Sequence, residues 1–457
     1  MEKRSYRMIL FGTLAAAFLL RLSLITSGGQ YYWPDEQRYD GSCDAARALM
    51  SGDYRAVFVA LHRADHFLYR IVGLFPAIIQ IRYSDSPKVP AVFFSIFSVA
   101  CLWLIGGIIR KFGGNDRESL FGVILLALST SFLYYSRHLL PYDMSMAFGL
   151  FSLFAGLRRP ARIRDSFLCG FFSLACFLTY NGYWIISGIA LITHILRYPT
   201  PLDQLIKRAL ASGFSFIIPL VVILSASAVA GRDLIGQFIR FSYTISQGEF
   251  AEGWRLPFAY LWHSEHLITI LWIAAFLMTI ITIASRRSTE AQLIAFFAAV
   301  SIYIILVIFS VVLEKFVVYG RLVRQLVPFV TILSALFLEK LWVSNSKSRY
   351  MAISIIFIVL CQALWNFRKP VFQTFPSEFI KNAAEVSASY DSTEYSVLFA
   401  HHIDPEPKFI EDGGIAIVRK RHPLSFLPYQ YEGYTPEQRS KLRSTDIDMR
   451  IIINDKL

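Results

Sequence analysis

The chain has 457 residues, of which 55% are hydrophobic and 17% are charged, and its formal net charge is +12. Soluble domains carry about 25% charged residues, so this composition argues against a soluble globular protein and excludes a disordered chain, a coiled coil and a disulfide scaffold. The apolar residues come in long runs that do not alternate, and they predict an all-α polytopic membrane protein rather than a β-barrel. The basic excess is then typical of cytoplasmic loops and lipid contact, without nucleic acid as a partner.

The chain opens with a basic segment, and an apolar run follows it to about Thr26. Because no convincing small-residue cleavage site follows, we interpret this run as a retained first span with its basic end in the cytoplasm. Ten further apolar runs bring the predicted number of transmembrane helices to about eleven. They cover residues 89–109, 119–135, 143–157, 167–180, 183–196, 209–230, 266–284, 291–313, 322–341 and 350–366.

Every second connector between these runs is short and rich in Lys and Arg, which is typical of cytoplasmic loops. The runs 167–180 and 183–196 are each shorter than the roughly 20 residues of a full span, so they predict a hairpin of short helices or a re-entrant pair, broken near Asn181-Gly182. An odd number of spans places the C-terminal tail outside. Since the chain has no Asn-x-Ser/Thr sequon, we expect a bacterial inner membrane protein with a cytoplasmic N-terminus and a periplasmic tail.

Three segments outside the predicted membrane are long enough to carry function. They are residues 27–88, 231–265 and 367–457. The first predicts two helices on the membrane surface, one N-capped by Ser42 and ended by Ser51-Gly52, the other over residues 66–82. The last is polar with short alternating apolar runs, and it predicts a small extracytoplasmic α/β domain that rests on the membrane domain of residues 1–366. These runs cover residues 396–400, 415–418 and 449–453.

Charged and aromatic residues follow the first span closely, in the order Asp35, Glu36, Arg38 and Tyr39. Taken alone, an ordinary polar loop beside an interfacial aromatic belt would explain them equally well. Their meaning therefore depends on what else lies on the same side of the membrane.

Two further groups of charges fall on that side. Arg137 and Asp143 lie between the third and fourth spans, and Arg321 and Arg324 open the tenth. A short turn that reaches water would explain the first group, and arginines that snorkel to lipid phosphates would explain the second. Burying ionisable groups at membrane depth costs free energy, however, and unrelated polar loops would not all be expected on the same side of the membrane. The three groups together therefore indicate one extracytoplasmic site.

This combination suits a substrate that is an amphiphilic phosphate. Arginines hold a phosphate and stabilise the charge that develops as it leaves. A carboxylate deprotonates an incoming hydroxyl, or two carboxylates hold a divalent cation. A nearby carboxylate also stabilises the oxocarbenium-like transition state of glycosyl transfer. The residues thus favour group transfer from a lipid phosphate at the outer face.

Four motifs occur in order along the predicted spans: Asp35-Glu-Gln-Arg-Tyr39, Leu49-Met-Ser-Gly-Asp53, Tyr135-Ser-Arg137 with Asp143, and Arg324-Gln-Leu-Val-Pro328. In this order the chain resembles the integral-membrane glycosyltransferases of the GT-C class, in the branch of protein O-mannosyltransferases and lipid A aminoarabinose transferases. The resemblance covers about residues 27–185 and 320–340. It implies a GT-C fold and the transfer of a sugar from a polyprenyl monophosphate to an extracytoplasmic acceptor, which would be lipid A, another envelope glycan or a protein.

The resemblance also implies roles for individual residues. Asp35 would be the catalytic base or acceptor-orienting carboxylate of an inverting displacement, and Asp143 the second acid near it. The two would share a divalent cation such as Mg²⁺, Mn²⁺ or Zn²⁺ where one is needed, a point on which relatives differ. Glu36 would orient, and Arg38 and Tyr39 would shape the donor site. The candidates for the donor phosphate are Arg137, Arg321 and Arg324.

Two departures from the family pattern limit what carries over. Gln325 stands where the family has Tyr, and His62-Arg-Ala-Asp-His66 replaces the Glu-Lys-Pro or Pro-Pro-Leu sequence that precedes the second surface helix in relatives. Arg63 or His66 would take the phosphate role there, or each is a plain surface residue. The alternative function is a flippase or transporter for lipid-linked sugars. Transporters place broken helices at the midplane and often contain repeats, whereas here the acids gather outside and no convincing repeat is evident.

Overall fold

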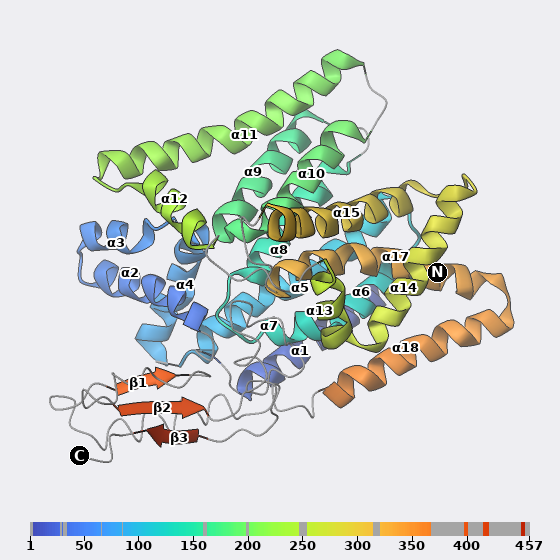
Figure 1. Ribbon diagram of the computed structural model, residues 1–457, viewed down its shortest axis with the longest axis horizontal. Coiled ribbons are helices and arrows are strands. Elements are labelled where there is room, and N and C mark those ends of the chain that lie inside the picture. Colours follow the sequence, from blue (N-terminus) through green and yellow to red (C-terminus); the bar gives the residue numbers. More distant parts are fainter. Residues whose placement is uncertain are drawn as a thin grey trace.

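A computed structural model describes most of the chain up to residue 366 and three short strands beyond it (Figure 1). The described residues are 3–27, 30, 34–64, 66–84, 86–158, 162–197, 201–245, 254–313, 320–366, 397–400, 415–419 and 449–452. Each of the eleven predicted apolar runs contains a helix, as the sequence predicts. These helices are α1 (Lys3–Thr26), α5 (Lys88–Lys111), α6 (Asp116–Leu128) with α7 (Thr130–Tyr135), α8 (Tyr142–Gly156), α9 (Ile163–Thr179), α10 (Trp184–Leu196), α11 (Leu202–Val229), α14 (Leu267–Ala284), α15 (Glu290–Val307) continued by a π-helical turn (Ile308–Val312), α17 (Val327–Ser344) and α18 (Ser346–Asn366).

Within the described part of the chain, seven helices are long and apolar enough to cross a membrane. The seven are α1, α5, α11, α14, α15, α17 with the short helix before it, and α18. The other predicted spans are shorter helices, α6 to α10, and the break predicted between two of them is a 3₁₀ turn over Asn181–Tyr183. The chain is therefore a multi-pass membrane protein whose long helices are combined with a set of short ones.

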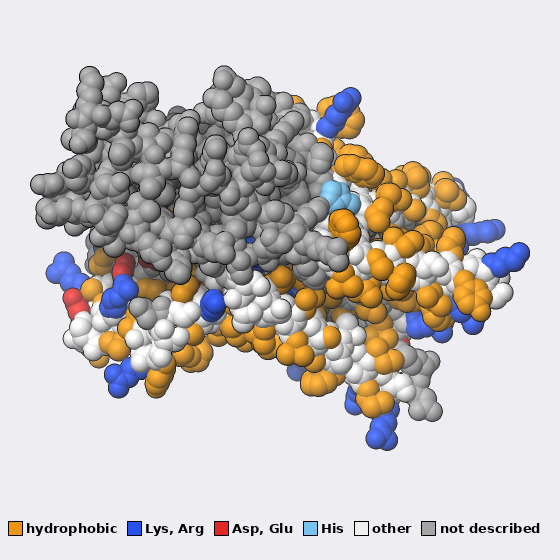
Figure 2. Space-filling view, turned by 90° about the horizontal axis from the view of Figure 1, so that it is seen from below, with side chains coloured by type: hydrophobic (Ala, Val, Ile, Leu, Met, Phe, Trp, Pro, Cys, Tyr) orange, Lys and Arg blue, Asp and Glu red, His pale blue; other side chains and the backbone are white. Residues whose placement is uncertain are grey.

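Large apolar side chains face outward over much of the bundle. Phe11, Ile218 and Leu277, from three different helices, are each more than half exposed. Figure 2 shows a face on which hydrophobic side chains cover the helices, while Lys and Arg project mainly from its margins. A surface of this kind fits a lipid environment, since soluble monomers rarely expose large apolar patches.

Small side chains allow the short helices to pack closely. Ser145 and Ser152 of α8 donate hydrogen bonds of 2.8 Å to the carbonyl oxygens of Cys176 and Cys169 in α9. Gly149 lies between them, and a Cβ added there would stand 3.3 Å from the sulfur of Cys176. Buried hydroxyls that bond across an interface, together with glycine, are typical of helix packing in membranes. The α8–α9 pair is therefore a firm support for Asp143, which lies at the start of α8.

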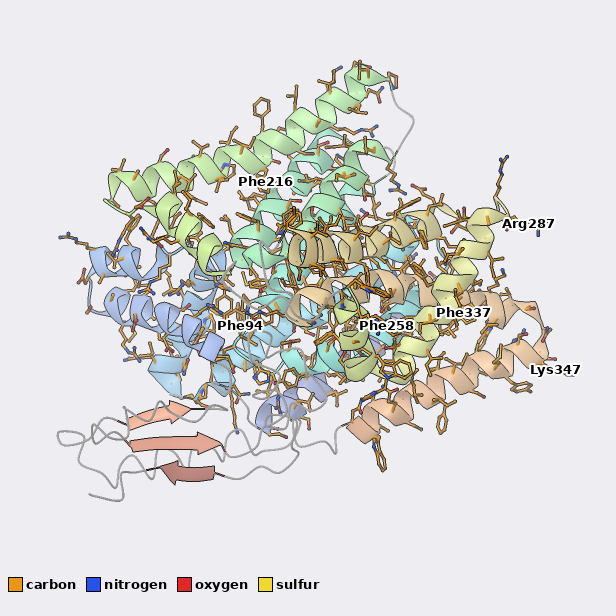
Figure 3. All side chains as sticks on the ribbon, in the orientation of Figure 1. Phe94, Phe216, Phe258, Arg287, Phe337 and Lys347 are labelled. Atoms are coloured by element: carbon orange, nitrogen blue, oxygen red, sulfur yellow. The ribbon has the colours of Figure 1, made fainter. Side chains whose placement is uncertain are left out.

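The basic connectors meet at one end of the bundle. Arg117 forms an ion pair of 2.7 Å with Glu339 near the end of α17, and Arg197 contacts the backbone of Lys111. Figure 3 shows Arg287 and Lys347 at this end, which also holds the N-terminus in Figure 1. The helices of the first outer segment lie at the opposite end. The separation of basic connectors from outer segments is thus confirmed, and the cytoplasmic location of the basic end stays a prediction.

The first outer segment contains a 3₁₀ helix (Pro34–Tyr39) and the helices α2 (Asp40–Met50), α3 (Tyr54–Leu61) and α4 (Phe67–Tyr83). The helices α2 and α4 match the two predicted surface helices. The predicted cap of the first is wrong: α2 begins at Asp40, and Ser42 instead donates to the carbonyl of Arg70 at 3.0 Å, which ties α2 to α4. Its end is as predicted, with Gly52 at φ +78°, and Asp53 then caps the unpredicted α3 by accepting from the Ala56 N–H.

The second outer segment contains α12 (Leu234–Ile245) and α13 (Leu256–Glu265), and α16 (Gly320–Val323) leads through a 3₁₀ turn (Arg324–Leu326) into α17. In the tail, β1 (Val397–Ala400) pairs in parallel with β2 (Ile415–Arg419), which pairs antiparallel with β3 (Met449–Ile452). The registers place Val397 opposite Ile415 and Ala416 opposite Ile452. The strands coincide with the three predicted alternating runs. The rest of the tail lies outside the described residues, so a separate domain from residue 367 stays a prediction.

Candidate functional site

The centre of the site is a buried ion pair between Asp143 and Arg324. Asp143 lies in the first turn of α8, and Arg324 lies in the 3₁₀ turn before α17. Nη2 of Arg324 contacts Oδ1 of Asp143, and both side chains are almost completely buried. The guanidinium carbon also lies 4.0 Å from the ring centroid of Phe132 and 5.0 Å from that of Tyr135. Arg324 therefore points into the protein rather than out to lipid phosphates, and Asp143 is no water-exposed turn residue.

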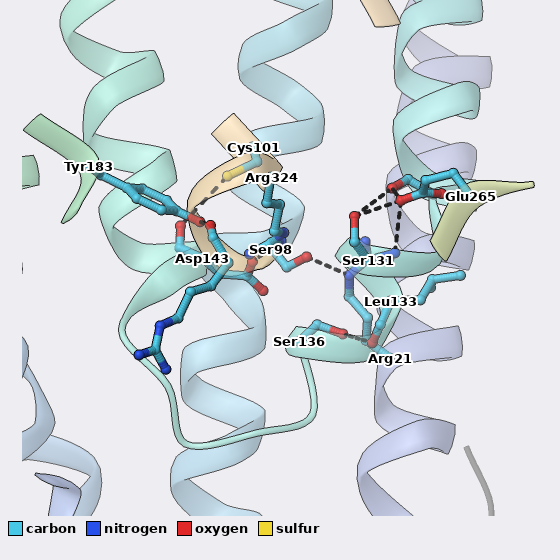
Figure 4. A network of polar contacts seen from close by, with 12 residues as sticks. Arg21, Ser98, Cys101, Ser131, Leu133, Ser136, Asp143, Tyr183, Glu265 and Arg324 are labelled. Atoms are coloured by element: carbon cyan, nitrogen blue, oxygen red, sulfur yellow. Dashed lines mark hydrogen bonds and ion pairs between the residues drawn. The ribbon is translucent and has the colours of Figure 1, made fainter. Parts of the chain in front are cut away.

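A second buried arginine, which the sequence analysis missed, lies beside this pair. Arg21 of α1 donates from Nε to the hydroxyl of Ser98 at 2.9 Å and from Nη1 to the carbonyl of Ala17 at 3.0 Å. It is close enough to interact electrostatically with Asp143 and Arg324, and Figure 4 shows Ser98 between Arg21 and that pair. Arg21 is the only ionisable residue in the first apolar run, and that isolation is the signal that could have found it.

The buried nitrogens of these two arginines are not all used. Among the described residues, Nη2 of Arg21 and both Nε and Nη1 of Arg324 have no hydrogen-bond partner. Buried N–H groups are costly to leave unpaired, and charged ones more so. The site therefore contains donors that an anion would satisfy.

The carboxylate of Glu36 holds the loop between α7 and α8. It is fully buried and accepts from the backbone N–H of Leu139 at 2.6 Å and contacts Nδ1 of His138 at 3.2 Å. The hydroxyl of Tyr69 donates to the carbonyl of Leu139 at 2.7 Å, and the Gln30 amide donates to that of Arg137 at 3.0 Å. The loop that connects Arg137 to Asp143 is thus fixed by the first outer segment.

The remaining residues of the first motif are only partly described. The backbone of Asp35 belongs to the 3₁₀ helix Pro34–Tyr39, but its side chain lies outside the described part of the structure, and so does any test of its predicted role. Arg38 is half-buried. Tyr39 is fully buried and packs edge-on against Phe94 of α5 with ring centroids 6.0 Å apart. Glu36 nevertheless shows that this turn lies against the loop of Arg137.

An aromatic cluster, formed by Tyr142, Tyr180 and Tyr183, covers the start of α8. The rings of Tyr142 and Tyr180 are 4.9 Å apart, and His66 stacks on Tyr180 with 5.4 Å between centroids. Arg321 donates to the hydroxyl of Tyr142 at 3.0 Å, and its carbonyl accepts from Tyr183 at 2.9 Å. The cluster therefore brings His66 and Arg321, from distant parts of the sequence, to the same place as Asp143.

Arg63 lies elsewhere, in a basic pocket of about 390 Å³ between the first and second outer segments. The pocket is also lined by His62, Arg232, Gln237 and Arg240, and partial burial lowers the pKa of His62. The amide of Gln237 accepts from the backbone N–H after Arg63 at 3.2 Å, which joins the two segments. Arg63 is exposed, in contrast with the buried arginines of the centre.

The described donors do not by themselves fit a metal ion. Among the side chains that the structure describes, no three His, Cys, Asp or Glu come together as a metal site would require. Of the predicted pair, only Asp143 is described: Oδ1 is bound by Arg324, and Oδ2 alone is without a partner. One carboxylate oxygen is too few for Mg²⁺ or Zn²⁺.

Comparison with known proteins gives no match to a protein-family model and no match among curated proteins. Solved structures do match. The crystal structure of ArnT from Cupriavidus metallidurans bound to undecaprenyl phosphate superposes with a TM-score of 0.57 at 10% identity, over 92% of this chain and 94% of ArnT. The chain has the GT-C fold. The apo structure of the same ArnT agrees, with a TM-score of 0.56 at 12% identity over 89% of this chain and 92% of ArnT.

Because the match extends over nearly the whole of both chains, the GT-C fold includes the first outer segment and the helices that carry the Asp143–Arg324 pair. The predicted fold class is therefore confirmed. A more distant match, archaeal AglB from Archaeoglobus fulgidus with a dolichol phosphate, has a TM-score of 0.49 over 94% of this chain and 58% of AglB.

Proposed function

We propose that this chain is a glycosyltransferase of the inner membrane that transfers a sugar from a polyprenyl monophosphate to an extracytoplasmic acceptor. The observation that carries the proposal is the buried Asp143–Arg324 pair with Arg21 beside it, in a GT-C fold. The ArnT structure with this fold holds undecaprenyl phosphate. A group of buried guanidinium donors with unused N–H groups suits the phosphate of such a lipid.

The arginines would act on the leaving group. As the bond between the anomeric carbon and the phosphate oxygen breaks, its electron pair passes to the phosphate, and fixed guanidinium groups stabilise that charge without reorganisation. Arg324, held in place by Asp143, is the first candidate, and Arg137 and Arg321 are the other two. His66, which stacks on Tyr180 of the aromatic cluster, would help to bind the phosphate. Arg63 would attract the phosphate from the outer pocket.

The acidic residues would act on the acceptor. Asp35 accepts the proton of the acceptor hydroxyl. The hydroxyl oxygen attacks the anomeric carbon from the side opposite to the leaving phosphate, so that the reaction inverts configuration. Asp143 orients Arg324, and Glu36 keeps the intervening loop in place. Arg38 and Tyr39 would shape the donor site. If the reaction uses a divalent cation, Asp35 and Asp143 would hold it. The acceptor is lipid A, an envelope glycan or a protein.

Product analysis tests the proposal. Membranes that contain the wild-type chain, supplied with labelled polyprenyl-phosphate sugars, are expected to give a glycosylated product, which mass spectrometry of envelope glycolipids would identify. Asp35→Asn and Asp143→Asn should each reduce transfer roughly 10²- to 10⁴-fold. Asp44→Asn is the matched control, because Asp44 is exposed on α2 and forms an exposed ion pair with Arg47 at 3.1 Å.

Two results would contradict the proposal. Wild-type turnover in both Asp35→Asn and Asp143→Asn would remove these residues from the site. Translocation of the intact sugar lipid in vesicles, with no glycosylated product from any donor, would instead support the flippase.

A further inference from the structure

Glu265, at the C-terminal end of α13, is a fully buried carboxylate that lies far along the sequence from the family motifs. It accepts four hydrogen bonds: from the hydroxyls of Ser129 and Ser131 at 2.7 and 2.6 Å, and from the backbone N–H groups of Thr130 and Ser131 at 2.7 and 3.0 Å. Figure 4 shows this group beside the Asp143–Arg324 network. All four donors lie at the first turn of α7, more than 130 positions away in the sequence.

The helix that receives these bonds is short and needs them. α7 has six residues, and the extended backbone of Ser129 separates it from α6. A helix of this length is not stable alone, and its first N–H groups have no partner within the helix. Water is not available to them inside a membrane protein. The side chain of Ser129 makes no local cap, so a carboxylate from another segment takes its place, where the helix dipole also favours negative charge.

The other side of Glu265 is fixed as well. Its carbonyl accepts from the Gln362 amide at 2.6 Å, and the oxygen of the same amide accepts from the Leu267 N–H at 2.7 Å. Asn366 donates to the hydroxyl of Thr130 at 3.0 Å. The end of α13 and the start of α7 are therefore both attached to the last two turns of α18.

The position of α7 determines where the loop of residues 136–141, which leads to α8, starts. Its last residue, Tyr135, stacks under Arg324, and the loop from residue 136 leads through Arg137 to Asp143. Glu36 holds the middle of this loop, as described above, and Glu265 holds the helix that precedes it. Two buried carboxylates, one from each of the first two outer segments, thus hold this loop and the helix before it.

We infer that Glu265 is a positioning residue of the transfer site: by capping α7 it sets the placement of Tyr135, Arg137 and Asp143 relative to Arg324. Its effect on turnover rests on the proposed function, whereas its effect on α7 does not. The control is Glu339, which is also a buried carboxylate but binds Arg117 at the opposite end of the bundle.

The experiment compares Glu265→Gln, the control Glu339→Gln and the wild-type chain, all full length in detergent. Glu265→Gln keeps the shape of the side chain but replaces one acceptor with a donor that faces donors, so hydrogen exchange of residues 129–139 should rise about tenfold. Glu339→Gln should leave that exchange unchanged. In the transfer assay we expect Glu265→Gln to lower kcat about tenfold while the KM for the donor lipid stays within about twofold, since the donor still binds but Asp143 is misaligned relative to Arg324.

Each outcome decides a separate point. Unchanged exchange of residues 129–139 in Glu265→Gln would overturn the cap, and raised exchange with unchanged kcat would overturn the positioning role. An equal loss of kcat in Glu339→Gln would assign the effect to general destabilisation. If Glu265→Gln does not fold, Ser131→Ala removes one of the four donors, and hydrogen exchange of residues 129–139 is measured in that variant instead. If the wild-type chain yields no product with any donor, the proposed function fails while the exchange still tests Glu265.

Discussion

Asp143 and Arg324 each depend on the other for their place in the protein. They are 181 positions apart in the sequence, and both are buried among aromatic side chains. Removing one partner of a buried pair leaves an uncompensated charge, whereas removing both leaves a neutral cavity. The pair therefore serves to fix Arg324 in one orientation more than to stabilise the fold.

This dependence can be measured. Arg324→Gln should lower the free energy of unfolding in mixed detergent by about 3–5 kcal/mol, and the double variant Asp143→Asn/Arg324→Gln should recover most of that loss. Neither should transfer sugar. Arg47→Gln, which breaks the exposed pair with Asp44, should cost less than about 1 kcal/mol. If the losses of unfolding free energy in Asp143→Asn and in Arg324→Gln simply add in the double variant, the two residues do not interact as the structure indicates.

The place of each site residue in the chain decides whether the sequence alone could identify it. Asp143 and Arg324 stood out because charges next to apolar runs are costly, but nothing local joins two residues so far apart. Arg21 carried the same signal and was overlooked inside a run interpreted as a span. Glu265 lies just before the run 266–284, where an acid is ordinary, so its role as a distant cap could not be predicted.

At the scale of elements, the sequence predicted a helix in each of the eleven apolar runs and the break near Asn181-Gly182, because long apolar runs and turn residues are local signals. It missed α3, which has eight residues and depends on the cap from Asp53. It also misjudged Ser42, whose hydroxyl bonds to α4 rather than to its own helix. Only the second error has a distant cause: the contact that decides the role of Ser42 comes from α4, whereas Asp53 directly precedes the helix that it caps.

The contact between α13 and α16 gives an element-scale prediction. A Cβ added at Gly320 would lie 2.0 Å from the buried ring of Tyr260, so Gly320→Ala should force these two helices apart and shift Arg324, four residues later. We expect a loss of about 1–3 kcal/mol in the free energy of unfolding and a decrease in transfer.

The control is Gly213→Ala in α11, where nothing lies within 4 Å of the added Cβ. Alanine is the better helix former there and should leave stability unchanged or raise it by up to about 1 kcal/mol. Equal thermal stability of the two variants in detergent would show that Gly320 does not pack against Tyr260.

At the scale of the whole molecule, the charges are sorted into two sets with different partners. At the basic end, Arg117 and Arg197 pair with acids or backbone carbonyls near the ends of neighbouring helices. At the other end, arginines lie inside the bundle, next to Asp143. The first set fits the positive-inside rule, and the second fits a substrate. The +12 charge therefore combines topology with chemistry.

This sorting predicts which end of the molecule faces the cytoplasm. The turn between α2 and α3 and the start of α18 lie at opposite ends of the bundle (Figure 1). The first contains Ser51 and the second Ser346, and both serines are exposed. In a variant without the five native cysteines, Ser51→Cys should react with a membrane-impermeant thiol reagent from the outside of intact cells. Ser346→Cys should react only after the membrane is opened. The reverse pattern would place the Asp143–Arg324 site on the cytoplasmic side, where the sugar acceptor would have to be sought instead.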